Sequence, residues 1–291
     1  MTMHALFPAG DVGVDRPLSG ATALVTGGAG AIGSSAALHM LRDGAAVVLM
    51  GRRRDALDQT RDRCLDEVPG AYVEVLSGNA RDSADVRSAV STAHAISGRL
   101  DIVVTTVGGG EFRPLLMHDA TSFADEFDLN VVSAFLAIRH GVPLMGRGGA
   151  IVCVSSNASH NVTPWMSAYA VAKGALENLV RAAADEFGHL GIRVNAVRPG
   201  LTRTASSESK SADDRVIDAV LAEVPLNRIG RPEDIGAAIR YLAGPESSWV
   251  TGQSLAIDGG AELRKNPNIM EPLVTLYGQE RIDAVLRGEA P

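Results

Sequence analysis

The sequence is short of the residues that metal centres and disulfide frameworks need. Its 291 residues include only 2 cysteines, which stand far apart. Cys64 falls on an expected helix and Cys153 within an apolar strand, a pattern that favours buried thiols in a reducing compartment. No histidine and cysteine are spaced as metal ligands are, so we expect no metal site.

The chain also lacks a basic stripe and a long apolar run. Its net charge is -7 and its longest basic run is "GRRR" at 51–54, which leaves a nucleic-acid partner no electrostatic footprint. No apolar run approaches the roughly 20 residues that span a bilayer, and the N-terminal segment has no basic stretch followed by an apolar core. With 46% hydrophobic and 21% charged residues, the chain is expected to be a globular, cytoplasmic protein without a membrane partner.

Strand-like and helix-like segments alternate along the chain. Helical periodicity, as at 34–44, 83–96 and 175–191, separates most of seven short apolar runs at 21–28, 45–50, 71–78, 101–106, 150–156, 192–200 and 254–258. Continuous apolar strands followed by helices favour a parallel sheet buried on both faces. We therefore expect an α/β fold, a doubly wound parallel sheet in three layers. One domain should span 20–260, with an N-terminal extension at 1–19 and a C-terminal tail at 261–291.

Ligands of such sheets bind beyond the carboxyl ends of the strands. The first strand ends in "TGGAGAIG" (26–33), where Gly27, Gly30 and Gly33 permit a tight turn, a close approach to a pyrophosphate and helix packing. A purely structural turn would use the same glycines. The position after the first strand favours nucleotide binding.

The second strand ends in "LMGRRRDAL" and predicts the choice of nucleotide. Sites for NAD usually carry an acid here for the ribose hydroxyls, whereas a 2′-phosphate calls for arginine. Gly51 stands where the acid would be, followed by Arg52 and Arg53. A solvated, basic helix start is the alternative. The pattern favours NADP(H), with NAD(H) as a possible second cofactor.

Chemistry is expected in "SSNASHNVTPWMSAYAVAK" (155–173). Tyr169 and Lys173 are four residues apart, so on a helix they share one face. A fixed cation and an oxidised nicotinamide would lower the pKa of the phenol from about 10. The chain has 3 lysines among its 27 basic residues, so a lysine retained here indicates a need for a compact ammonium group.

Over residues 20–260 the chain resembles the short-chain dehydrogenases/reductases of the short, single-domain type. The resemblance rests on "TGGAGAIG", "LNVVSAF" (129–135), Ser156 thirteen residues before Tyr169, "YAVAK", "IRVNAVRPGLTRT" (192–204) and "PLNRIGRPEDIGAAIRYLAGPESSWVTGQSLAIDGG" (225–260).

The resemblance implies four catalytic residues. Tyr169 would be the general acid in reduction and the base in oxidation, while Lys173 would bind the nicotinamide ribose and depress the tyrosine pKa. Ser156 would hydrogen-bond the substrate oxygen, and Asn130 would hold a water that links Lys173 to solvent. The cofactor would supply the hydride.

It also implies binding residues. Besides Tyr169 and Lys173, contacts to the cofactor are expected at Gly27, Ala29, Gly30, Ala31, Ile32, Arg52, Arg53, Asn79, Ala80, Val107, Gly108, Pro199, Gly200, Thr202 and Thr204. Contacts to the substrate are expected at Gly109, Asn157, His160, Trp165 and Leu201, although a solvent-facing histidine and a packing tryptophan are equally good interpretations of His160 and Trp165.

The sequence departs from the family pattern in three features. The glycines match TGxxGxxG of the extended relatives, which include nucleotide-sugar epimerases and dehydratases, rather than TGxxxGxG. Asn79 replaces an aspartate that accepts a hydrogen bond from adenine, which an amide oxygen also accepts. Thr105 and Thr106 replace asparagines that brace neighbouring strands, a role that a β-branched hydroxyl residue partly fills.

Two segments stand outside the motifs. Residues 204–224 change from polar to amphipathic and predict a mobile substrate lid, with an ordinary surface loop as the alternative. The tail has apolar residues at helical spacing, Leu273, Leu276, Tyr277, Ile282, Val285 and Leu286. It either closes a substrate pocket or packs on a neighbouring subunit.

The sequence thus predicts an NADP(H)-dependent enzyme that interconverts a secondary alcohol and a ketone on a small or medium-sized molecule. An epimerase or dehydratase that retains NAD is the alternative, and a non-catalytic NADP-binding regulator is a further one. A homodimer or homotetramer is expected from the family.

Overall fold

The computed structural model describes residues 16–204, 214–264 and 270–290. Most of the N-terminal extension, and the part of the expected lid between 205 and 213, lie outside these ranges. Seven parallel strands form one sheet in the order β3-β2-β1-β4-β5-β6-β7. Their bounds are β1 Thr22–Thr26, β2 Ala46–Gly51, β3 Val73–Ser77, β4 Ile102–Thr105, β5 Gly149–Val154, β6 Ile192–Pro199 and β7 Ser254–Ile257.

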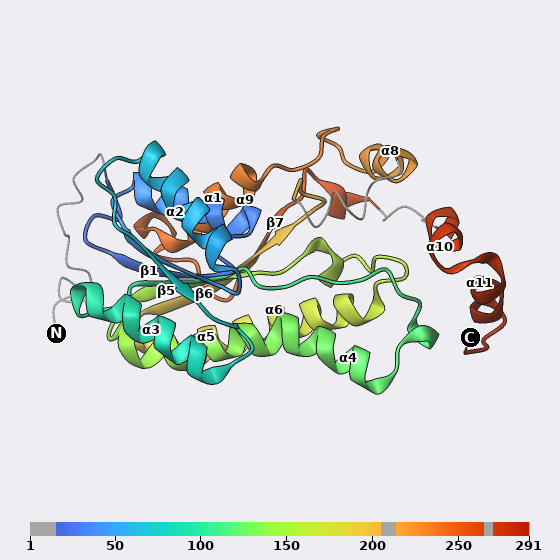
Figure 1. Ribbon diagram of the computed structural model, residues 1–291, viewed down its shortest axis with the longest axis horizontal. Coiled ribbons are helices and arrows are strands. Elements are labelled where there is room, and N and C mark those ends of the chain that lie inside the picture. The colour runs from blue at the N-terminus through green and yellow to red at the C-terminus, as the bar shows by residue number, and fades with distance from the viewer. Residues whose placement is uncertain (1–15, 205–213, 265–269, 291) are drawn as a thin grey trace.

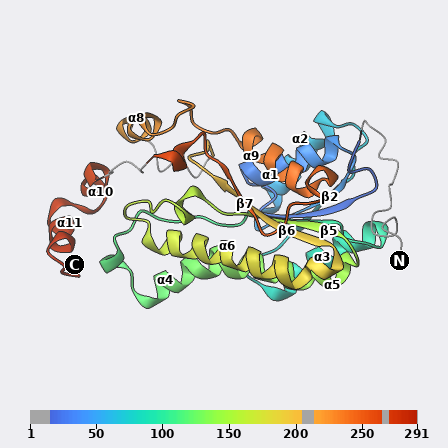
Figure 2. The ribbon, with the colours of Figure 1, turned by 180° about the vertical axis from the view of Figure 1, so that it is seen from behind.

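Helices cover both faces of the sheet (Figures 1 and 2). On one face lie α1 (Ala31–Arg42), α2 (Arg54–Glu67) and α9 (Pro232–Ala243). On the other lie α3 (Ser83–Ser97), α5 (Ser133–Met145) and α6 (Ser167–Phe187), with α4 (Ala120–Phe127) beyond them. The predicted three-layer, doubly wound α/β fold is confirmed.

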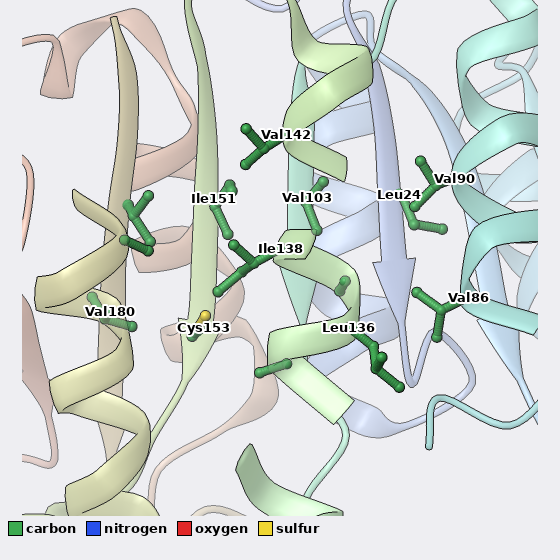
Figure 3. Packing of buried hydrophobic residues seen from close by; sticks show 14 of the residues in the cluster. Leu24, Val86, Val90, Val103, Leu136, Ile138, Val142, Ile151, Cys153 and Val180 are labelled. Atoms are coloured by element: carbon green, nitrogen blue, oxygen red, sulfur yellow. The ribbon is translucent and has the colours of Figure 1, made fainter. Parts of the chain in front are cut away.

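Two clusters of buried side chains, one on each face of the sheet, form the core because the strands are apolar on both faces. Leu24 of β1, Val103 of β4 and Ile151 of β5 are fully buried and point toward side chains of α3 and α5, such as Val90 and Ile138 (Figure 3). Burying each such side chain stabilises the fold by about 1.5–3 kcal/mol. Both cysteines are free and buried, as predicted.

The order of the strands reverses between β1 and β4. The chain leaves β1 toward β2 and β3 on one side, and returns to continue through β4 to β7 on the other. Helices therefore leave neighbouring strands in opposite directions at this point, and a crevice between their first turns is where ligands of such sheets bind. The segments after β1 and β4 meet there.

Three short helices lie at one end of the molecule (Figures 1 and 2): α8 (Asp214–Ala222), α10 (Met270–Tyr277) and α11 (Gln279–Leu286). In the tail, Leu273 and Ile282 are buried while Leu276 and Leu286 are exposed, so the helical spacing read in the sequence is confirmed. The hydroxyl of Tyr277 donates to the carbonyl of Phe112, in the loop after β4. No helix in the described ranges is long and apolar enough to cross a membrane.

Candidate active site

The turn between β1 and α1 packs closely against the end of β4 and against the first turn of α1. Gly27 has φ 74, and a Cβ there would lie 2.5 Å from Thr106 Oγ1. A Cβ at Gly33 would lie 2.5 Å from Gly27 O, whereas one at Gly30 would meet only Gly27 O, at 3.1 Å. Gly30 therefore leaves the outer side of the turn open at the start of α1, where the N–H groups of Ala31 and Ile32 lack helical acceptors. These residues fit a pyrophosphate group.

Thr106 holds the end of β4 against this turn. Its hydroxyl donates to Thr26 O at 2.8 Å and also lies 3.3 Å from Gly27 O. Thr105, one residue earlier, hydrogen-bonds the Cys153 thiol of β5, whose pKa is raised by burial to about 11. The predicted bracing role of the two threonines is confirmed. Val107, which is partly buried, and Gly108, which is exposed, follow directly after these threonines.

Exposed arginines follow the end of β2. Arg54 pairs with Asp58 at 2.9 Å, but within the described ranges neither Arg52 nor Arg53 forms an ion pair. A Cβ on Gly51 would meet Leu57 Cδ2 at 3.5 Å, an ordinary contact. Packing therefore leaves room for an acidic side chain at position 51, although the chain has a glycine there.

Asn79 uses its side chain in its own turn. Its Oδ1 accepts the N–H of Arg81 at 3.1 Å, and its own N–H donates to Asp85 at 2.8 Å. Ala80 beside it is buried. Asn79 is exposed at the end of β3, so its expected contact with adenine stays a prediction.

Ser156, Tyr169 and Lys173 come together at the end of β5. Since α6 begins at Ser167, Tyr169 lies in its first turn and Lys173 one turn later, with Nζ 5.7 Å from the tyrosine ring centroid. Ser156 follows β5 and hydrogen-bonds the phenol. Lys173 is only 3% exposed and donates to Val154 O at 2.8 Å.

Burial is the largest cause of the pKa shifts of Lys173 and Tyr169. It lowers the pKa of Lys173 to about 8, although the neighbouring Cys153, Glu126 and Glu177 act to raise that pKa. It raises the pKa of Tyr169, opposed by the hydrogen bond from Ser156 and assisted by Glu126. Ser156 is the group that lowers the tyrosine pKa here, and the expected depression of that pKa by Lys173 stays a prediction.

Asn130 clamps the loop after β4. It lies in a π-helical turn, Asp128–Val132, between α4 and α5, and is fully buried. Its Oδ1 accepts the N–H of Gly109 at 3.1 Å, and its Nδ2 donates to Gly109 O and to Glu126 O, each at 2.8 Å. A Cβ on Gly108 would lie 2.7 Å from Asn130 Oδ1 and 2.8 Å from Lys173 Nζ. Asn130 thus sits beside Lys173, and its role in holding a water stays a prediction.

The third glycine of the loop touches the tyrosine. A Cβ on Gly110 would lie 2.5 Å from both Cβ and Cδ2 of Tyr169. Gly110 is buried, so the loop backbone packs directly on the phenol ring. This contact explains why the third consecutive residue of the loop is also a glycine.

The expected substrate residues lie on the rim of this group. Trp165 has φ 66, and its carbonyl accepts the N–H of Arg113 at 2.7 Å. Its buried indole N–H has no hydrogen-bond partner among the described residues. Asn157 begins a 3₁₀ turn after Ser156, and His160 is exposed beyond that turn.

The segment after β6 completes the surroundings. Pro199 ends β6, Gly200 N donates to Ile257 O at 3.1 Å, and Thr202 Oγ1 donates to Gly200 O at 3.0 Å. The carbonyl of Leu201 accepts the N–H of Gly230 at 2.9 Å, and Thr204 is the last residue before the undescribed segment. Because β6 pairs with β5, this segment lies beside that of Ser156.

Two carboxylates of the site, Glu126 and Glu177, were not predicted from the sequence. Glu126 precedes Asn130 by one helical turn, and Glu177 follows Lys173 by one turn. The four-residue spacing was the available signal for both, because it places each acid on the helix face of a predicted catalytic residue.

Residues 27–262 match the family described as enoyl-(acyl carrier protein) reductase. A 3α-hydroxysteroid dehydrogenase from Mediterraneibacter gnavus is 33% identical over 246 residues, 84% of this chain and 98% of the relative. The structure of a short-chain dehydrogenase/reductase from Mycobacterium ulcerans matches with a TM-score of 0.87 and 32% identity, covering 91% of this chain and 98% of that one.

A second solved structure is a 7α-hydroxysteroid dehydrogenase in complex with NADH and 7-oxo glycochenodeoxycholic acid. It matches with a TM-score of 0.81 and 30% identity, covering 87% of this chain and 97% of that one. The motifs, the fold and the relatives agree over most of the chain. The chain therefore belongs to the short-chain dehydrogenase/reductase family and is an NAD(P)-dependent oxidoreductase.

Proposed function

We propose that the protein interconverts a secondary alcohol and a ketone with NADP(H) as its preferred cofactor. The observation that carries this proposal is the assembly of Ser156, Tyr169 and Lys173 at the end of β5. It lies at the same edge of the sheet as the glycine turn after β1, which fits a pyrophosphate. Relatives named as hydroxysteroid dehydrogenases support the alcohol and ketone pair.

Tyr169, Ser156 and Lys173 each have a separate role in ketone reduction. Tyr169, whose raised pKa keeps the phenol protonated, gives its proton to the carbonyl oxygen. Ser156 donates a hydrogen bond to the same oxygen as negative charge develops there. The ammonium of Lys173 stabilises the phenolate that remains. The nicotinamide cofactor, when bound, supplies the hydride. In alcohol oxidation each step runs in reverse.

The preference for NADP(H) rests on the end of β2. Arg52 and Arg53 are exposed and form no ion pair within the described ranges, so their guanidinium groups are free to receive a 2′-phosphate. Gly51 leaves the acid position empty although an acid would fit there. NAD(H) remains a weaker, alternative cofactor.

The substrate is a small or medium-sized organic molecule, and the protein assembles as a homo-oligomer. We place a small or medium-sized organic substrate against Gly109, Trp165 and the segment after β6, under the tail helix whose Tyr277 contacts Phe112. Exposed apolar side chains on α4, α5 and α6, namely Phe127, Phe135 and Val171, support a homodimer or homotetramer. Light scattering of the purified protein tests the assembly.

The spacing of the glycines favours a second candidate, an epimerase or dehydratase that retains NAD. The purified protein is denatured to release any bound nucleotide, and separate samples are mixed with NADPH and a panel of ketones. Consumption of NADPH at 340 nm supports the proposal. Retained NAD with no net change in absorbance supports the epimerase instead, and bound NADP without turnover supports the regulator.

A further inference from the structure

A carboxylate lies buried directly behind the active-site serine. Glu177 lies on α6 one turn after Lys173 and is 8% exposed. Its Oε1 accepts the hydroxyl of Ser155 at 2.9 Å and lies 2.5 Å from the hydroxyl of Ser159. These two serines bracket Ser156 on the 155–159 turn, so one carboxylate oxygen contacts the turn on both sides of the residue that hydrogen-bonds Tyr169.

The second oxygen of Glu177 faces a different segment. Arg198 Nη1 lies 3.6 Å away, and Arg198 immediately precedes Pro199 at the end of β6. The same guanidinium binds Glu262 through two hydrogen bonds of 2.7 and 2.8 Å. Glu177 and Glu262 thus share one arginine, but only Glu177 also reaches the 155–159 turn.

Burying charged groups costs free energy that an ion pair often fails to offset, so stability alone does not account for this cluster. Its distinguishing feature is its location. Glu177 contacts the turn that carries Ser156, shares a helix face with Lys173, and adjoins the strand end before Gly200.

We propose that Glu177 is a positioning residue of the active site, fixing the 155–159 turn, the Lys173 turn of α6 and the end of β6 in one arrangement. The inference rests on the proposed function for the chemistry that this arrangement serves. The contacts themselves are independent of it.

The charge of Glu177 has a second effect. Lys173 faces Cys153 of β5, Glu126 of α4, and Tyr169 and Glu177 of its own helix. Burial lowers the pKa of Lys173, and Glu177 is one of the groups that oppose this change. Replacing its carboxylate with an amide of equal size should therefore lower the pKa of Lys173 further.

Three variants separate charge, geometry and simple loss of stability. Glu177→Gln keeps the shape and removes the charge, while Glu177→Asp keeps the charge but is too short to reach both serines. Glu262→Gln is the matched control, because it removes the other carboxylate on Arg198 without touching the 155–159 turn. Thermal unfolding of each variant establishes its folded fraction.

The first readout needs no turnover. With only 3 lysines in the chain, the titration of ¹³C-labelled lysine side chains resolves Lys173, identified by the signal that Lys173→Arg removes. We expect its midpoint to fall in Glu177→Gln and to stay at the wild-type value in Glu262→Gln. An unchanged midpoint in Glu177→Gln, or equal shifts in both variants, would overturn the electrostatic part of the inference.

The second readout is kinetic. We expect kcat to fall about tenfold in Glu177→Gln and in Glu177→Asp while KM for NADPH changes much less, since Glu177 contacts neither the glycine turn after β1 nor Arg52. Wild-type kcat in both variants would overturn the positioning role. A wild-type protein that turns over no ketone, yet shows the expected lysine titration, would refute the proposed function and leave the electrostatic inference standing.

Discussion

The two ends of the expected cofactor site are built differently. At the end of β5, Ser156 and Lys173 are buried and Tyr169 is packed under Gly110. At the end of β2, Arg52 and Arg53 are exposed and form no ion pairs in the described part of the chain. Bond-making chemistry needs atoms held within fractions of an ångström, whereas recognition of a phosphate needs only charge within reach.

The difference predicts where substitutions are tolerated. Changes at the β5 end should act mainly on kcat, because every side chain there contacts another group of the site. Changes at the β2 end should act on nucleotide affinity and leave the chemical step alone.

Tyr169→Phe should lower kcat by about 10²- to 10⁴-fold, because only the proton donor is lost. The Kd for NADPH, measured by fluorescence titration, should change little. A variant that keeps substantial turnover would show that another group supplies the proton.

Gly110→Ala should lower kcat by about tenfold or more, since the new methyl group would push the Tyr169 ring out of position. Gly109→Ala is the comparison, because a Cβ there has no protein atom within 4 Å, and its kcat should fall much less, any contact of the methyl group with the substrate appearing in KM for the ketone. Equal losses in the two variants would contradict the contact.

Arg52→Ala should raise KM for NADPH about 10- to 100-fold and leave KM for NADH nearly unchanged, as expected for loss of a charged hydrogen bond. Gly51→Asp should improve the use of NADH, because an acid fits beside Leu57 and would receive the ribose hydroxyls. Steady-state kinetics with both nucleotides test the pair. Equal effects of Arg52→Ala on both would show that it does not read the 2′-phosphate.

The pKa of Lys173, lowered from 10.5 to about 8, predicts a pH dependence. The ammonium is charged below about pH 8 and neutral above it, so kcat/KM for NADPH-dependent reduction should fall as the pH rises through 8. Lys173→Arg should be less active but should lose this alkaline decline, since arginine stays charged. The same shift also destabilises the folded protein below pH 8, because the unfolded chain binds the lysine proton more tightly. The free energy of unfolding should therefore rise as the pH rises from 8 to 10.5.

Tyr277→Phe should have the smallest effect, because one hydrogen bond to Phe112 contributes about 1 kcal/mol. We expect a few-fold rise in KM for the ketone with kcat and nucleotide affinity unchanged. A fall in oligomer mass instead, seen by light scattering, would assign the tail to a subunit contact.

The sequence predicted the fold because its signals are local. Apolar strands, glycine turns and helical spacing each report on short stretches of chain, and all seven strands were located. The meeting of Ser156, Tyr169 and Lys173 was also predictable, since two of them share a helix face. The Glu177 cluster was not, because Arg198 and Glu262 reach it from segments far apart in the sequence. A long-range contact leaves no periodic signal in any one of its segments.

Trp165 carries a further consequence. A tryptophan at φ 66 costs on the order of 1–3 kcal/mol, and its surroundings have to hold it there. The N–H of Arg113 and the bridge between Arg113 and Met166 are the contacts that do so. If these contacts were broken, relaxation of Trp165 would offset part of the free energy that they contribute. The net stability of this edge of the site is therefore smaller than its hydrogen bonds alone suggest.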